Sequence, residues 1–163
     1  MQKKINGAML KNMILTASKL LDLNRPTIDS LNVFPVPDGD TGTNMSLTLQ
    51  SAVKELNNIK TNSIYDIADA VGRGALRGAR GNSGVILSQV LRGFCNTIRD
   101  AHDFIDTKLF TKALFVGAQV AYNAVSKPKE GTMLTVARMV AEHAQNIESK
   151  NRDFETYFPE ILK

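Results

Sequence analysis

The sequence predicts an all-α fold, arranged as an up-and-down barrel of antiparallel helices. Seven segments repeat apolar residues at helical spacing, and none alternates polar and apolar residues over the length of a strand. Trp is absent and aromatic residues make up only 6% of the chain, so the core is expected to consist mainly of Leu, Ala, Val, Ile and Met. The connections are short, which favours antiparallel neighbours. A chain of 163 residues is of the size expected for one domain.

Each predicted helix begins at a capping side chain or at a turn rich in Gly, Ser and Thr. The approximate starts are Asn6, Thr43, Ser63, Asn82, Asp106, Gly131 and Asp153. The first helix is expected to end at Leu23, because Asn24-Arg25-Pro26 follows and proline stops a helix. The second should end by Asn57-Asn58 and the fifth near Val125, while the last continues to the chain end.

The composition argues against several classes of function. The net charge is only +4 and the basic residues are scattered, so neither nucleic-acid binding nor attachment to a membrane is indicated. Cys95 has no partner for a disulfide within the chain, which favours a reducing compartment. No signal peptide and no membrane-spanning run is recognisable. We therefore expect a cytoplasmic protein.

The most informative segment is 32–44, which reads Asn-Val-Phe-Pro-Val-Pro-Asp-Gly-Asp-Thr-Gly-Thr-Asn. It places two carboxylates, Asp38 and Asp40, in a Pro/Gly loop immediately before a helix. Carboxylates suit Mg²⁺, and helix-start N–H groups favour phosphate. A calcium EF-hand is excluded, because its sixth and twelfth positions would be Thr43 and Leu49. Ordinary turn chemistry is the alternative explanation for an Asp-Gly-Asp sequence.

The helix starts add a second argument for a phosphate site. In an up-and-down bundle the second, fourth and sixth helices all begin at the same end. Their starts are Asp-Gly-Asp-Thr-Gly-Thr, Gly-Asn-Ser-Gly and Glu-Gly-Thr, so three sets of backbone N–H groups should converge beside the two carboxylates. Ser83 and Thr132 taken singly would be read as plain N-caps. Their conjunction with the carboxylates favours a nucleotide phosphate site.

Other candidate residues give weaker signals. Arg73, Arg77 and Arg80 are spaced to share one helix face, which indicates either a solvated face or, for the last two, neutralisation of phosphate charge. His102 and His143 lack a recognisable nucleophile partner and are expected at the surface. Neither a Walker A loop nor a Rossmann fingerprint occurs in the sequence.

Three segments, 31–45, 78–89 and 127–134, resemble the motifs of fatty acid kinase A-subunit proteins. Their N-terminal nucleotide-binding domain is shared with the L subunit of dihydroxyacetone kinase. The resemblance implies an all-helical barrel that holds ATP or ADP and Mg²⁺ at one end. The metal ligands it implies are Asp38, Asp40 and Asn32, the last standing where the dihydroxyacetone kinase branch has a third aspartate. The nucleotide-binding residues it implies are Thr41, Thr43, Asn44, Ser83, Gly84, Thr132 and Met133.

The resemblance also implies an activity. The Val-Phe-Pro-Val-Pro run at 33–37 is closer to the fatty acid kinase branch, in which ATP phosphorylates a fatty acid held by a separate lipid-carrying protein to give an acyl phosphate. No general base is identified, and an ionised carboxylate acceptor would need none. Two alternatives stay open: a glycerone-type kinase subunit acting on a small ketose, and a non-catalytic domain that keeps ADP bound.

The resemblance further implies that residues 1–163 form an incomplete nucleotide-binding domain. The family domain normally continues through another helical hairpin, and further domains follow in the longer proteins. We therefore expect little kinase turnover from this chain alone.

Overall fold

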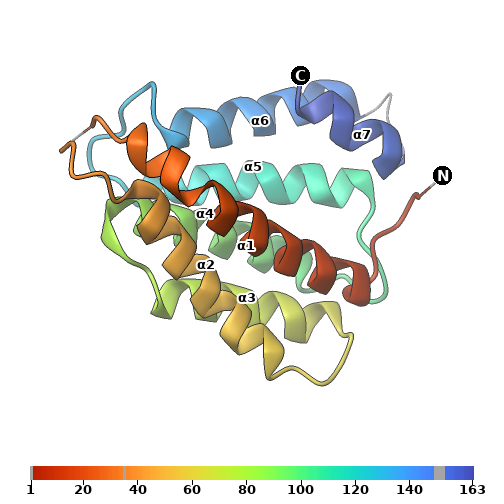
Figure 1. Ribbon diagram of the computed structural model, residues 1–163. Coiled ribbons are helices and arrows are strands. Elements are labelled where there is room, and N and C mark those ends of the chain that lie inside the picture. The colour runs from red at the N-terminus through yellow and green to blue at the C-terminus, as the bar shows by residue number, and fades with distance from the viewer. Residues whose placement is uncertain (1, 35, 149–152) are drawn as a thin grey trace.

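The structure is a computed structural model that describes residues 2–34, 36–148 and 153–163. These residues form seven helices and no β-strand, which confirms the all-α class (Figure 1). The helices are α1 (Gly7–Ser30), α2 (Thr41–Asn57), α3 (Ile64–Arg77), α4 (Gly81–Ile98), α5 (Thr107–Asn123), α6 (Met133–Glu148) and α7 (Phe154–Ile161). Each helix packs against the next along the chain, and α2 also packs against α4.

Four of the predicted helix starts are confirmed by their capping hydrogen bonds. In each case a side-chain oxygen accepts the backbone N–H of the residue three positions later, which satisfies a donor that the helix itself leaves open. The pairs are Asn6 with Met9 (2.9 Å), Ser63 with Asp66 (3.3 Å), Asp106 with Leu109 (2.8 Å) and Asp153 with Thr156 (3.1 Å).

The predicted end of the first helix is wrong. Helix α1 does not stop at Leu23 but continues through Pro26 to Ser30. Proline removes one helical hydrogen bond, yet the turns that follow it pack closely against the start of α2. A Cβ built on Gly42 would lie 2.5 Å from the Arg25 carbonyl oxygen, so the two backbones are in contact there. This tertiary packing favours continuation of the helix. The contact comes from α2, so the local sequence around Pro26 gives no sign of it.

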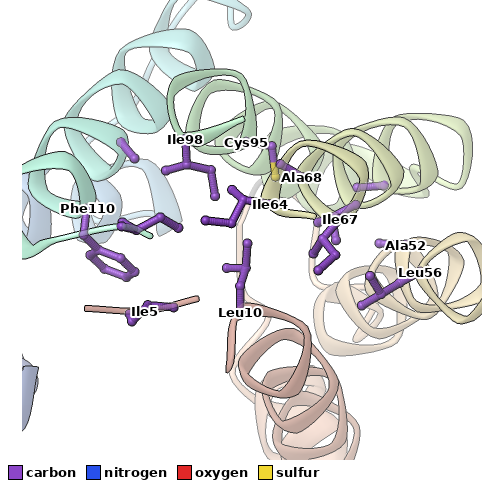
Figure 2. Close-up of a cluster of buried hydrophobic side chains, with 14 of the residues drawn as sticks. Ile5, Leu10, Ala52, Leu56, Ile64, Ile67, Ala68, Cys95, Ile98 and Phe110 are labelled. Carbon is purple, nitrogen blue, oxygen red and sulfur yellow. The ribbon is translucent and has the colours of Figure 1, made fainter. Parts of the chain in front are cut away.

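The main core lies between the first five helices (Figure 2). Phe154 and Tyr157 of α7 also belong to it. Side chains from the inner faces of these helices meet there, and several are fully buried. They include Ile5, Leu56, Ile64, Ile67, Ile98 and Tyr157, each at most 1% exposed. Phe110 packs edge-on against the rings of Phe94, Phe154 and Phe158, which joins α5 to α4 and to the short α7.

The two ends of the bundle differ. At one end, Ile5 and Ile105 exchange both backbone hydrogen bonds at 2.8 Å, and the Phe154 N–H donates to the Gln2 carbonyl at 2.8 Å. These bonds fasten the N-terminal segment to the rest of the chain. At the other end, α2, α4 and α6 all begin, as the up-and-down order predicts (Figure 1). Throughout the described ranges, every helix is too short or too polar to span a bilayer.

Candidate functional site

A pocket of about 700 Å³ opens at the end of the bundle where α2, α4 and α6 begin. Its walls come from the last turn of α1, the connection 31–40, the starts of α2 and α4, and the segment 125–134. The predicted site residues that line it are Asn32, Asp38, Asp40, Thr41, Asn44, Ser83, Thr132 and Met133. Thr43 and Gly84 do not line it. The expectation that three helix starts meet beside the two carboxylates is therefore met in the structure.

Asp38 and Asp40 are exposed at the pocket wall and are separated by Gly39, which has a φ of 67°. Neither carboxylate accepts a hydrogen bond or forms an ion pair within the described part of the chain. Nor do the described residues hold a group of three or more His, Cys, Asp or Glu side chains placed to bind one metal ion. Two free carboxylates suit Mg²⁺, which commonly takes one or two from the protein and the remaining oxygens from phosphate and water.

Asn32 has a structural role in this arrangement. Its side-chain oxygen accepts the Asp40 N–H at 3.2 Å, the Thr41 N–H at 3.2 Å and the Thr41 hydroxyl at 2.8 Å. Its amide group donates to the Val36 carbonyl at 2.9 Å. The side chain thus caps α2 and folds the acidic loop back on itself. The implied third metal ligand therefore presents an oxygen that already has three donors.

Asp29, which the sequence analysis did not identify, completes the cap of α2. Its carboxylate accepts the Thr43 N–H at 2.9 Å and the Thr43 hydroxyl at 2.7 Å. These bonds, the backbone one above all, hold the pKa of Asp29 below its usual value. No local signal could have identified this pair, because 14 residues separate its members.

The start of α2 was expected to offer open backbone N–H groups, but those of Thr43 and Asn44 already have acceptors within the protein. The Thr43 N–H is taken by Asp29, and the Asn44 N–H donates to the Asp40 carbonyl at 2.8 Å as part of the helix. The start of α2 therefore contributes side chains to the pocket rather than open N–H groups.

The start of α4 is different, because no side chain in the described ranges caps it. Its first helical hydrogen bond is donated by Gly84 to the Arg80 carbonyl at 2.9 Å, so the N–H groups of Gly81, Asn82 and Ser83 precede the helical ladder. All three residues line the pocket. The Ser83 hydroxyl donates to the Thr41 carbonyl at 3.3 Å and so ties α4 to α2. Of the three helix starts, α4 offers the clearest anion site.

Gly84 is buried against α2 rather than facing the pocket. A Cβ built on it would lie 2.3 Å from the Thr48 hydroxyl oxygen. That hydroxyl accepts the Arg80 N–H at 3.1 Å and donates to the Asn44 carbonyl at 2.7 Å. Glycine at this position allows the two helices to approach closely, which differs from the predicted approach of a phosphate.

Two lysines that the sequence analysis did not single out, Lys127 and Lys129, line the pocket from the connection between α5 and α6. The Lys129 ammonium lies 5.0 Å from the centre of the Phe34 ring on the facing connection. The Thr132 hydroxyl donates to the Lys129 carbonyl at 2.8 Å. The pocket therefore carries cations on the α6 side and carboxylates on the α2 side. Both lysines belong to segment 127–134, which the sequence analysis used only as a family motif.

The arginines take no part in the pocket wall. Arg73 pairs with Asp69 and Arg77 with Glu55, each at 2.8 Å, and both guanidinium groups are largely exposed. Arg80 lies before α4 and so does not continue the face of α3 that was predicted for all three. These observations favour the solvated-face interpretation over phosphate binding.

Comparison with known proteins supports the family resemblance. The profile of the DAK2 domain matches residues 35–163, which is most of the chain. The chain is 48% identical over 144 residues to uncharacterised proteins of Staphylococcus aureus strains USA300, NCTC 8325 and RF122. The alignment covers 88% of this chain but only 26% of each relative, so the chain spans about a quarter of their length. The chain therefore belongs to the DAK2-domain family, which is related to the L subunit of dihydroxyacetone kinase.

Proposed function

We propose that this chain is a Mg·ATP-binding domain of a phosphoryl-transfer enzyme. The observation that carries the proposal is the pocket of about 700 Å³, where two free carboxylates oppose two lysines and an uncapped helix start. Phosphoryl transfer depends mainly on positioning the reactants and on neutralising charge, and these groups supply the means for both. Membership of the kinase-related DAK2-domain family makes nucleotide use plausible.

Each wall of the pocket has a separate role in this proposal. Asp38 and Asp40 hold Mg²⁺, which when bound neutralises charge on the phosphate oxygens. The N–H groups at 81–83 and the ammonium groups of Lys127 and Lys129 bind the phosphates. Thr41, Asn44 and Ser83 provide polar side chains on the wall between them, and Thr132 and Met133 lie beside the nucleoside.

The acceptor is proposed from the resemblance of segment 31–45 to the fatty acid kinase branch. A fatty acid presented by a lipid-carrying protein would be converted to an acyl phosphate in the cytoplasm. The acid is already ionised at neutral pH, so the transfer needs no general base. A small ketose as acceptor, or ADP held without turnover, are the alternatives that the assay below distinguishes.

The test of nucleotide binding is a calorimetric titration of the protein with Mg·ADP and Mg·ATP. The Asp38→Asn/Asp40→Asn double variant should lose Mg²⁺-dependent binding while keeping its helical circular dichroism spectrum, because neither carboxylate has a structural partner among the described residues. Asp103→Asn is the matched control, since that exposed aspartate lies in the connection at the opposite end of the bundle. Wild-type affinity in the double variant would refute the metal assignment.

The test of the acceptor follows acyl phosphate, trapped as a hydroxamate, with and without a lipid-carrying protein. Residues 1–163 should turn over more slowly than a full-length relative, because the chain spans about a quarter of such a protein. Turnover on dihydroxyacetone instead of fatty acid would favour the ketose kinase. Nucleotide binding without turnover by either protein would favour the non-catalytic domain.

A further inference from the structure

The connection between α5 and α6 has two sides with different roles. Lys127, Lys129 and Gly131 line the pocket from it. Glu130, between them, points into a hydrogen-bonded network that lies outside the pocket. The other members of the network are Tyr122 on α5 and Thr135, Arg138 and Glu142 on α6.

Glu130 is the centre of this network. Its carboxylate accepts the Thr135 hydroxyl at 2.9 Å, the Arg138 guanidinium at 2.9 Å and the Tyr122 hydroxyl at 3.3 Å. The bond from Thr135, followed by that from Arg138, lowers the pKa of Glu130. The group is therefore an anion at neutral pH, held by donors from both flanking helices.

Thr135 links Glu130 to the backbone of the connection. While its hydroxyl donates to Glu130, it accepts the N–H of Gly131 at 2.9 Å. Gly131 has a φ of 78°, a conformation that glycine adopts readily, so the chain turns sharply at this bond. The turn lies two residues after Lys129 and two residues before the start of α6 at Met133.

Arg138 anchors the network to α6. One terminal nitrogen lies 2.9 Å from Glu130, the other lies 3.1 Å from Glu142 one turn further along the helix, and its Nε lies 3.4 Å from the Tyr122 hydroxyl. A guanidinium group can serve three such partners at once because its donors are fixed in one plane. Arg138 therefore joins α5, α6 and the connection between them without touching the pocket.

We propose that Arg138 is a positioning residue, which holds Glu130 and thereby sets the connection that presents Lys127 and Lys129 to the phosphates. The inference rests on the proposed function, because the phosphates that the two lysines would bind belong to the nucleotide proposed there. It adds a role for residues on the outer side of the connection. Neither Glu130 nor Arg138 lines the pocket, so the pocket wall alone would not indicate this role.

The first experiment measures the connection without any nucleotide. Trypsin cleaves after lysine but not before proline, so the bond between Lys129 and Glu130 is cleavable whereas that between Lys127 and Pro128 is protected. Arg138→Ala should accelerate cleavage at Lys129 several-fold, because a segment released from its anchors is a better protease substrate. Glu142→Gln is the matched control: it removes the pair within α6 and leaves Glu130 bound, so its cleavage rate should stay at the wild-type value.

The second experiment measures Mg·ADP affinity by calorimetry. Arg138→Ala and Glu130→Gln should each weaken binding several-fold, Arg138→Lys should weaken it less, and Glu142→Gln should leave it unchanged. Lys127→Ala should weaken binding in the wild-type background but have little further effect in Arg138→Ala, since the lysine is already misplaced there. A merely structural role for Arg138 predicts additive effects instead. Circular dichroism confirms that each variant is folded.

Faster cleavage together with weaker, non-additive binding supports the inference. Unchanged cleavage in Arg138→Ala overturns it, and so does faster cleavage with wild-type affinity. Failure of the unaltered protein to bind Mg·ADP would refute the proposed function, and with it the nucleotide role given to Arg138. The cleavage rates would still decide whether Arg138 holds the connection.

Discussion

Alanine at Gly72 and at Gly84 should change the free energy of unfolding in opposite directions. Both glycines lie inside helices, Gly72 in α3 and Gly84 in α4, and neither has a positive φ. In such positions alanine is preferred over glycine by about 0.5–1 kcal/mol, because the unfolded chain loses less conformational freedom. What distinguishes the two sites is the space around the added methyl group.

The distances determine the magnitudes. A Cβ at Gly72 would have the Cβ of Cys95 at 3.6 Å as its nearest heavy atom, which is an ordinary contact. The full gain of about 0.5–1 kcal/mol should therefore appear. A Cβ at Gly84 would lie 2.3 Å from the hydroxyl oxygen of Thr48, a fully buried residue whose hydroxyl makes two hydrogen bonds. Overpacking costs about 1–3 kcal/mol, so Gly84→Ala should be destabilised by about 0.5–2 kcal/mol after the gain is subtracted.

The assay is urea unfolding followed by circular dichroism, with both variants and the wild type side by side. The midpoint should rise for Gly72→Ala and fall for Gly84→Ala, with the dependence on urea unchanged. Thr48→Ala in the Gly84→Ala background removes the clashing oxygen and should recover part of the loss. A midpoint for Gly84→Ala at or above that of the wild type would refute the close packing of α4 on α2.

Two further predictions concern ionisable groups. The bonds from Thr43 lower the folded-state pKa of Asp29, so the stability it provides is present above its unfolded pKa of about 3.9 and is lost as the pH falls through the folded value. Asp29→Asn should therefore be less stable at pH 7 and lose part of its acid sensitivity in unfolding measurements; an unaltered pH profile would contradict the cap. Burial raises the pKa of Cys95 to about 12, so a disulfide reagent at pH 8 should label the thiol slowly in the native protein and rapidly in urea. Rapid labelling of the native protein would show that the thiol is accessible.

The fold and the location of the site could be predicted from local signals. The capping residues at Asn6, Ser63 and Asp106 act within three residues of themselves, so the sequence alone identifies them. The up-and-down order then places the even-numbered helix starts at one end by geometry alone. This is why the carboxylates at 38 and 40 were expected near Ser83 and Thr132, where the pocket has them.

The predictions that failed depended on contacts between distant parts of the chain. Pro26 is a strong local stop signal, but the packing of α1 against Gly42 outweighs it. The open amides predicted at the start of α2 are occupied by Asp29, from the preceding helix, and by Asn32. A helix start can be recognised from a few residues, whereas the group that caps it from elsewhere cannot. Lys127 and Lys129 differ from these cases, because they directly precede the predicted start of the sixth helix and the same up-and-down order would have placed them beside the carboxylates.

The backbone bonds at the closed end of the bundle have a consequence for the order of folding during synthesis. Gln2 and Ile5 leave the ribosome before their respective partners, Phe154 and Ile105. At usual rates of translation, roughly 5–20 s separate the emergence of Ile5 from that of its partner Ile105. The helical hairpins between them need only local contacts and can form meanwhile. The backbone of Ile5 must therefore wait until helices α1 to α4 have been synthesised before its partner emerges. During this interval Ile5 is open to a chaperone, and shielding it should matter more for yield than for the stability of the finished fold.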